Sequence, residues 1–235
     1  IKRLVFERLN TGGVKLLPQE IRNAIYNGFG NDMCTRLAEN STFRLLWNIP
    51  DPADVAAESD SDDEYLSAIE DEKIKKKLER HALYKRMYDV ELVLRFFAMR
   101  YLDDYDYALA DFMDDTLITL NNYSSDELDQ LKTLFEETVD KAYKLFGNKA
   151  LCIYDGVKWS SPARMVFDPM MVVLAQKDIS VGETNVEENV LKLQAFYSEA
   201  QKNNESLLFD GKHQSKDDIQ RRVNSLDGFI RSLCK

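Results

Sequence analysis

The feature that most constrains the fold is a run of apolar residues at helical spacing between Ile69 and Leu102. Its members recur every three or four positions, the interval that places side chains on one face of an α-helix. They are Ile69, Ile74, Leu78, Leu83, Met87, Val90, Leu94, Phe97, Ala98, Tyr101 and Leu102. We therefore predict one long helix here, or two helices in line, with one broad buried face.

Most of the remaining chain shows the same spacing, and several segments carry signals for helix ends. Ser124 followed by Glu127 predicts a capping box, and Gly147 ends the apolar pattern of the helix that follows. Other helices are expected over about 18–27, 186–203 and 216–234, with shorter ones after Asn31 or Asp32, after Ser41-Thr42 and from Ser161-Pro162, the last kinked at Pro169.

Only one short stretch favours extended structure, a small hairpin near 151–159 that turns at Asp155-Gly156. The sequence thus predicts an all-α protein, a multi-helix bundle of roughly eight to ten helices. With 235 residues, of which 44% are hydrophobic, the chain is long enough to bury a proper core. Residues 50–64 are rich in Asp, Ala, Ser and Glu, and we expect them to form a mobile acidic surface loop.

Charge and cysteine content limit the classes of function. The balance of 31 basic and 41 acidic residues gives a formal charge of -10, which argues against binding nucleic acid over the whole surface. A local basic patch remains open at Lys73 to Lys77 with Arg80, where a solvated helix face is the favoured interpretation. The three cysteines are widely spaced and suggest no disulfide framework. The sequence shows no secretory leader and no apolar run of the roughly 20 residues that span a membrane. These features favour a reducing cytoplasm.

Several isolated features are interpreted as structural. Arg95 lies in a strongly apolar helix and is expected to pair with a carboxylate or carbonyl, with a phosphate as the alternative ligand. Surface acidity is favoured over a magnesium site for Asp111, Asp114 and Asp115, and over a calcium loop for residues 60–64. Neither His81 nor His213 has a His or Cys at ligand spacing, and no complete catalytic set is found.

The segment from Leu4 to Tyr26 predicts a helix, a glycine loop and a second helix that begins at Pro18. Next to the two glycines, Asn10 and Thr11 place small polar groups and free backbone N–H groups at one spot. Such a spot has the chemistry that a phosphate requires. On the local pattern alone, a capped corner between two helices without any ligand is favoured.

Residues 6–16, with the sequence FERLNTGGVKL, and residues 19–24, with the sequence QEIRNA, resemble a known signature. It is the second signature of the GmrSD-type restriction-system N-terminal domain family, long catalogued as a domain of unknown function. Residues 86–97 and 163–171 also resemble segments of that family. The family has an Asn where this chain has Pro162-Ala163, so a polar contact is expected to be missing.

The resemblance implies a ParB/sulfiredoxin-like fold, of which this chain would be the helical part, and a nucleoside triphosphate with Mg²⁺ as cofactor. Members of the family bind and hydrolyse nucleotides through an Asp-Gly-Gln-Gln-Arg motif together with a Phe-x-x-x-Asn motif. Phe6 and Asn10 match the second motif, whereas the first is absent. We therefore expect a piece of a longer protein, inactive alone, with residues 1–178 in the family domain and 179–235 as a helical extension packed on it.

By the same resemblance, the chain contributes one wall of a nucleotide-binding site that regulates DNA cleavage in an anti-phage restriction protein. Asn10 would contact the nucleotide or its metal, and Phe6 would pack the motif helix. The remaining residues expected near the nucleotide or bracing the corner are Arg8, Thr11, Gly12, Gly13, Glu20 and Arg22. The expected partners are the missing motif segment, a His-Asn-His-type nuclease domain and DNA. The alternative is a helical interaction module without chemistry, whose acidic surface meets a basic partner.

Overall fold

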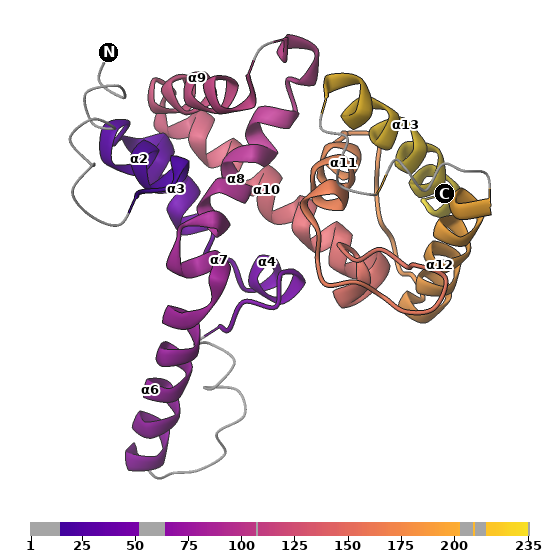
Figure 1. Cartoon of the computed structure of the whole chain (residues 1–235), viewed down its shortest axis with the longest axis horizontal. Coiled ribbons are helices and arrows are strands. Elements are labelled where there is room, and N and C mark those ends of the chain that lie inside the picture. The colour runs from indigo at the N-terminus through magenta and orange to yellow at the C-terminus, as the bar shows by residue number, and fades with distance from the viewer. Residues whose placement is uncertain (1–14, 52–63, 107, 203–208, 210–214, 235) are drawn as a thin grey trace. The chain divides into compact units, whose positions relative to one another are not determined.

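A computed structural model describes residues 15–51, 64–106, 108–202, 209 and 215–234, without the side chains of 64–71. Within these residues all regular elements are helices, and the prediction of an all-α multi-helix protein is confirmed. Figure 1 shows their succession along the chain. The helices divide into two compact units, the first from 1–45, 49–95 and 107–132, the second from 46–48, 96–106 and 133–235.

The first unit contains α2 (Pro18–Ile25), α3 (Phe29–Leu37), nearly all of α4 (Ser41–Leu46), α6 (Glu64–Arg80), α7 (Ala82–Lys85) and α9 (Leu109–Asn121). It also contains the first parts of α8 (Tyr88–Met99) and α10 (Ser125–Phe146). Its core is formed by the apolar faces of α3, α8 and α9, with fully or nearly fully buried Leu37, Val93, Leu94, Met113 and Leu117. This burial is the main stabilising contribution of these short helices, which would be marginal alone.

The second unit contains the ends of α8 and α10, the short 3₁₀ helices Leu102–Asp104 and Gly147–Lys149, α11 (Arg164–Leu174), α12 (Val186–Lys202) and α13 (Lys216–Leu233). Here α13 packs along α11. Aromatic rings fill much of the core: Phe96 lies 5.2 Å from Phe135, and Trp47 lies 5.5 Å from Phe167, between ring centroids. The division into units leaves the predicted boundary between 1–178 and 179–235 untested, although α13 does pack on a helix from before that boundary.

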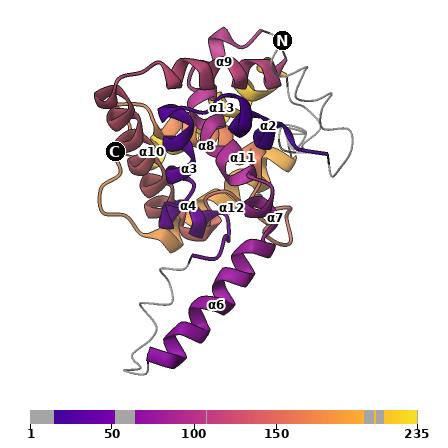
Figure 2. The same ribbon diagram turned by 90° about the vertical axis from the view of Figure 1, so that its left-hand side faces the viewer.

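The predicted helix between Ile69 and Leu102 is interrupted, so the expectation of one helix or two in line is wrong. The chain forms α6, α7 and α8, followed by the 3₁₀ turn, and Figure 2 shows α6 leading into α7. The break before α8 lies at Met87, whose φ of 56° is left-handed and incompatible with a continuous helix. The apolar spacing does not reveal this break, because Met87 continues the pattern of the apolar face, four positions after Leu83 and three before Val90.

Other helix ends follow the sequence signals. Ser124 and Glu127 form the predicted capping box, and α10 ends at Phe146 before Gly147, whose φ is 54°. The expected helices at 186–203 and 216–234 are α12 and α13. Two starts differ from the prediction: α3 begins at Phe29, before Asn31, and α11 begins at Arg164, after Pro162.

The predicted hairpin is reduced to a single antiparallel bridge between Tyr154 and Trp159. Asp155 shapes its turn, because its Oδ1 accepts hydrogen bonds from the backbone N–H groups of Val157 and Lys158 at 2.9 and 2.8 Å. Gly156 has a φ of 93°, a conformation that other residues rarely adopt. Most of the acidic segment 50–64 lies outside the described residues.

Candidate functional site

All six residues predicted to bind a nucleotide lie outside the described residues; they are Phe6, Arg8, Asn10, Thr11, Gly12 and Gly13. The described chain begins at Lys15, two positions after the glycine pair. The helix that follows, α2, is described in full, and it contacts Arg86, Glu91 of α8 and Asp114 of α9. The described residues therefore include the contacts that hold α2, the helix next to the candidate site.

Glu20 in the first turn of α2 is the first anchor. Its carboxylate accepts a hydrogen bond from the Leu17 N–H at 2.6 Å, which closes the start of the helix. It also accepts two hydrogen bonds from Arg86, each at 2.9 Å, from Nε to Oε1 and from a terminal nitrogen to Oε2. This fork-shaped pairing with the guanidinium lowers the pKa of the Glu20 carboxyl below its ordinary value.

Arg86 also holds the chain just before α2. Its second terminal nitrogen, which bonds Glu20, donates to the Lys15 carbonyl oxygen at 2.9 Å. Arg86 immediately precedes Met87, the residue with left-handed backbone between α7 and α8. One side chain at this break therefore fixes both ends of the stretch from Lys15 to Glu20.

Arg22 is the second anchor, and it is buried, with only 2% of its surface exposed. Its Nε donates to Asp114 Oδ1 at 2.7 Å, and one terminal nitrogen lies 3.3 Å from Glu91 Oε2. The other terminal nitrogen donates to the Ala110 carbonyl oxygen at 3.1 Å. Two carboxylates and a carbonyl thus compensate the buried guanidinium, which would otherwise be costly to desolvate.

The structure corrects the prediction of surface acidity for Asp114. Asp111 and Asp115 are exposed, but Asp114 is 7% exposed and pairs with Arg22 from the buried face of α9. Asp111 and Asp115, four residues apart, share the exposed face of α9, whereas Asp114 lies on its buried side. Among the described residues, no group of three or more His, Cys, Asp or Glu side chains could hold a metal ion.

Three asparagines fix the corner between α2 and α3. Asn31 donates from its side chain to Asn23 Oδ1 at 2.7 Å, and Asn121 of α9 accepts from the Asn31 backbone N–H at 3.1 Å. Asn121 also donates to the Tyr26 carbonyl oxygen at 2.9 Å. Gly30 permits this approach, since a Cβ there would lie 2.6 Å from the backbone carbon of Leu120. The corner is therefore held against α9 by amide hydrogen bonds.

Two of the segments that carry the family resemblance meet at these anchors. Glu20 and Arg22 belong to the segment 19–24, whereas Arg86 and Glu91 belong to the segment 86–97. The segment 163–171, which also resembles the family, lies in the second unit. Arg95, predicted to be a buried structural residue, is 4% exposed, and its expected role stays a prediction.

Sequence reasoning missed the partners of both anchors. Arg86 carried a signal, because it directly precedes an apolar helix and lies in a segment that resembles the family. For Asp114, the available signal was its position on α9 one residue from Met113, on the apolar side of the helix. Pairing across 92 positions in sequence leaves no local trace in a single chain.

Histidine and cysteine side chains are the usual candidates for acid–base and nucleophilic chemistry. His81 lies between α6 and α7, where partial burial lowers its pKa, and His213 lies outside the described residues. The thiols of Cys34, Cys152 and Cys234 are free, and burial raises the pKa of each. Raised thiol pKa values disfavour the reactive thiolate. The contacts described above position the chain around α2.

No protein-family model, curated protein or solved structure matches this chain. Within the described helices, none combines the length and the apolar character that crossing a bilayer would require.

Proposed function

We propose that residues 6–13 and α2 form one wall of a nucleoside triphosphate site, with Mg²⁺ as the accompanying ion. In this proposal the nucleotide controls DNA cleavage in a restriction or anti-phage defence protein of the cytoplasm. The observation that carries the proposal is the contact between two segments that resemble the GmrSD-type family. Glu20 from one segment receives both hydrogen bonds of the Arg86 fork from the other.

The physical support is the position of this contact in the chain. A loop that binds phosphate through backbone N–H groups must be held to within a fraction of an ångström, since small misplacements weaken such contacts strongly. Arg86 fixes the Lys15 carbonyl and the Glu20 carboxylate, and Arg22 fixes the next turn of α2. Anchoring is therefore concentrated directly after the proposed loop.

The proposed roles follow the family resemblance. Asn10 contacts the nucleotide or its metal, and Phe6 packs the helix that carries it. Phosphate oxygens lie near Arg8, Thr11 and the amides of Gly12-Gly13. An Asp-Gly-Gln-Gln-Arg segment completes the site, and a His-Asn-His-type domain in the same or a partner chain cuts the DNA.

The test is a calorimetric titration with ATP and with GTP, each with magnesium, on this chain and on the longest chain that its gene encodes. We expect the longer chain to bind one nucleotide and Asn10→Ala to abolish that binding. The matched control is Asn148→Ala, an exposed asparagine of the second unit. Absence of binding by both chains, or equal losses in the two variants, would contradict the proposal.

A second candidate function is a helical protein-interaction module without chemistry. The observation that favours it is Phe29 at the start of α3, whose side chain is 76% exposed. Exposed aromatic residues are common anchors of protein interfaces. If neither chain binds nucleotide, this function replaces the first, and Phe29→Ala is the variant that should weaken partner capture.

A further inference from the structure

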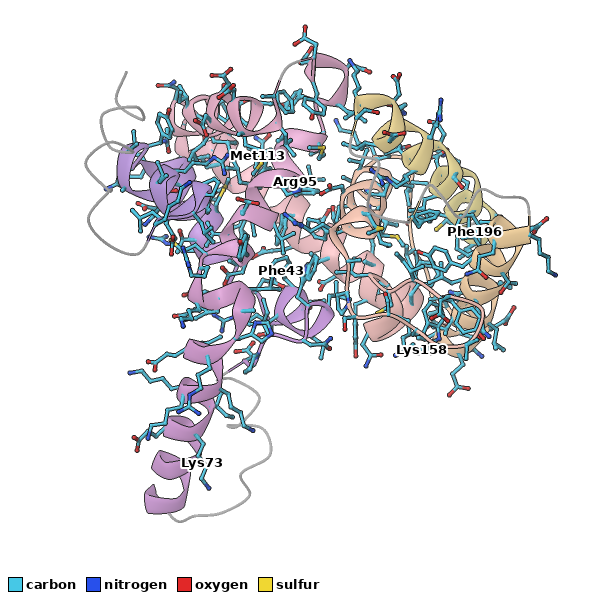
Figure 3. All side chains as sticks on the ribbon, in the orientation of Figure 1. Phe43, Lys73, Arg95, Met113, Lys158 and Phe196 are labelled. Atoms are coloured by element: carbon cyan, nitrogen blue, oxygen red, sulfur yellow. The ribbon has the colours of Figure 1, made fainter. Side chains whose placement is uncertain are left out.

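We infer that α6 carries a binding surface for the phosphate backbone of double-stranded DNA. The surface consists of Lys73, Lys76, Lys77 and Arg80, called here the basic arc. It lies in the first unit, and Figure 3 shows Lys73 on α6. The choice of DNA as the ligand rests on the proposed function. The inference that α6 has a binding surface is supported by the charge and exposure of its side chains.

The helix geometry of α6 groups these four residues. At 3.6 residues per turn, they fall within an arc of about 100° around the helix axis and span about 10 Å along it. All four side chains are exposed. No acidic residue between 72 and 80 falls inside this arc, because Glu72 and Glu79 occupy a neighbouring part of the helix circumference.

The arc faces away from the apolar side of the same helix. Ile74 and Leu78 fall on another part of the circumference, and Leu78 is only 6% exposed. Figure 2 shows no other described helix of the first unit alongside most of the length of α6. The burial of Leu78 therefore orients the helix, which leaves the basic arc open to solvent.

Within the described residues, most of this charge is not compensated. Lys76 forms an exposed pair with Glu72 at 2.7 Å, and such pairs on a helix surface contribute little to stability. The other three members of the arc form no ion pair with any described side chain. The basic arc is positively charged, whereas the whole chain has a formal charge of -10.

The composition of the arc favours nucleic acid over an acidic protein surface. Protein interfaces are depleted in lysine and depend on aromatic or aliphatic anchors at their centre. The basic arc has three lysines and one arginine, with no apolar residue between them on that face. Rows of exposed lysine are suited to a phosphate backbone, where each cation acts as a point charge and releases a counterion.

The test is fluorescence anisotropy of a labelled 20-base-pair DNA duplex of random sequence, titrated with the full chain without nucleotide at 50 to 200 mM KCl. Four phosphate contacts predict a slope of about -3.6 in log affinity against log salt, which is about 150-fold weaker binding across this range. The variant replaces the whole arc: Lys73→Gln, Lys76→Gln, Lys77→Gln and Arg80→Gln. Glutamine has nearly the helix propensity of lysine, so α6 should persist by circular dichroism.

The matched control removes four exposed cations elsewhere: Lys132→Gln, Lys144→Gln, Lys158→Gln and Lys192→Gln. It changes the net charge by the same amount, and one of its residues, Lys158, which Figure 3 labels, belongs to the second unit. We expect the arc variant to bind DNA at least 30-fold more weakly at 50 mM KCl and the control to remain within about threefold.

Three results would overturn the inference: no DNA binding by the wild-type chain, equal losses in the two variants, or arc-dependent binding of a polyglutamate peptide as tight as that of DNA. The last result would assign the surface to an acidic protein. Nucleotide affinity, measured separately on the arc variant, should be unchanged. DNA binding without any nucleotide binding would therefore refute the nucleotide site and leave the basic arc standing.

Discussion

The Nε of Arg22 in α2 lies 2.7 Å from Oδ1 of Asp114 in α9, and both side chains are almost fully buried. Glu91 of α8 approaches the same guanidinium at 3.3 Å. One buried cation therefore joins three helices of the first unit. The segment proposed to bind a nucleotide precedes α2, so the stability of this cluster bears directly on the proposed site.

Replacing one partner of the Arg22–Asp114 pair should destabilise the fold strongly. Asp114→Ala leaves a buried guanidinium with one fewer carboxylate, and we expect a loss of about 3–5 kcal/mol in the free energy of unfolding. Arg22→Met with Asp114→Leu should recover much of that loss, because both buried charges are then absent. Urea denaturation of Arg22→Met, of Asp114→Leu and of the double variant measures this coupling.

The control for this prediction is the exposed pair between Lys76 and Glu72 on α6. Glu72→Ala should leave the free energy of unfolding almost unchanged, since solvent screens exposed pairs. If Asp114→Ala were equally mild, Arg22 would not depend on this carboxylate for its burial.

The Glu20–Arg86 pair predicts a pH dependence of stability at the start of α2. The pKa of the Glu20 carboxyl is lowered in the folded chain, first by its hydrogen bonds with Arg86. The unfolded chain therefore binds more protons in the acid range, and the contribution of the pair is present above the ordinary Glu pKa. It is lost as the pH falls through the lowered folded value.

Glu20→Gln should accordingly be less stable than the wild type at pH 7, and the difference should disappear in strong acid. Chemical denaturation at a series of pH values between about 2 and 7 checks this. A difference that stays constant with pH would assign the loss to packing and not to the charge of Glu20.

Asp89 predicts a pH dependence of the opposite sign. The residue is 3% exposed, and burial is the main cause that raises the pKa of its carboxyl from 3.8 to about 6. The positive charge of Arg44 lowers this pKa, and the negative charge of Glu39 raises it. Between about pH 4 and 6 the folded chain binds more protons than the unfolded chain, so stability falls as the pH rises.

Asp89→Asn removes this titration. Relative to the wild type, the variant should gain stability as the pH rises from 4 to 7, by at most about 3 kcal/mol for a shift of this size. Thermal or urea unfolding at pH 4, 5.5 and 7 measures the trend. A wild type that gains as much stability as the variant over this interval would exclude a raised pKa at Asp89.

Two glycines in helices provide a matched pair of substitutions. Gly30→Ala should destabilise the chain by about 1–3 kcal/mol, because the new Cβ would lie 2.6 Å from the Leu120 backbone where α3 packs on α9. Gly228→Ala in α13 meets nothing within 4 Å and should stabilise it by up to about 1 kcal/mol. Melting temperatures that shift in the same direction would contradict the close approach of α3 and α9.

The sequence predicts the helical class and many helix ends because those depend on local chemistry. The Ser124–Glu127 cap and the end of α10 before Gly147 are examples, since each signal and its effect lie within a few residues. The interruption at Met87 could not be predicted this way. The contacts of Arg86 with Glu20 and Lys15 come from residues about 70 positions earlier.

The candidate site shows the same limit. Glu20 and Arg22 were expected to brace the corner after the proposed loop, but their partners could not be named from spacing. Asp114 looked like part of an exposed acidic group, because Asp111 and Asp115 are its sequence neighbours and both are exposed. Only the rotation of α9 separates the buried carboxylate from the exposed ones.

The most direct test of the anchored nucleotide wall is calorimetry of nucleotide with magnesium on Arg86→Gln and Arg231→Gln, in the longest chain that the gene encodes. Both arginines are partly exposed and pair with carboxylates, Arg86 beside α2 and Arg231 on α13. We predict that Arg86→Gln weakens nucleotide binding on the order of tenfold while the fold persists, and that Arg231→Gln leaves binding within about twofold. Equal affinities in the two variants would contradict the anchoring of the site by Arg86.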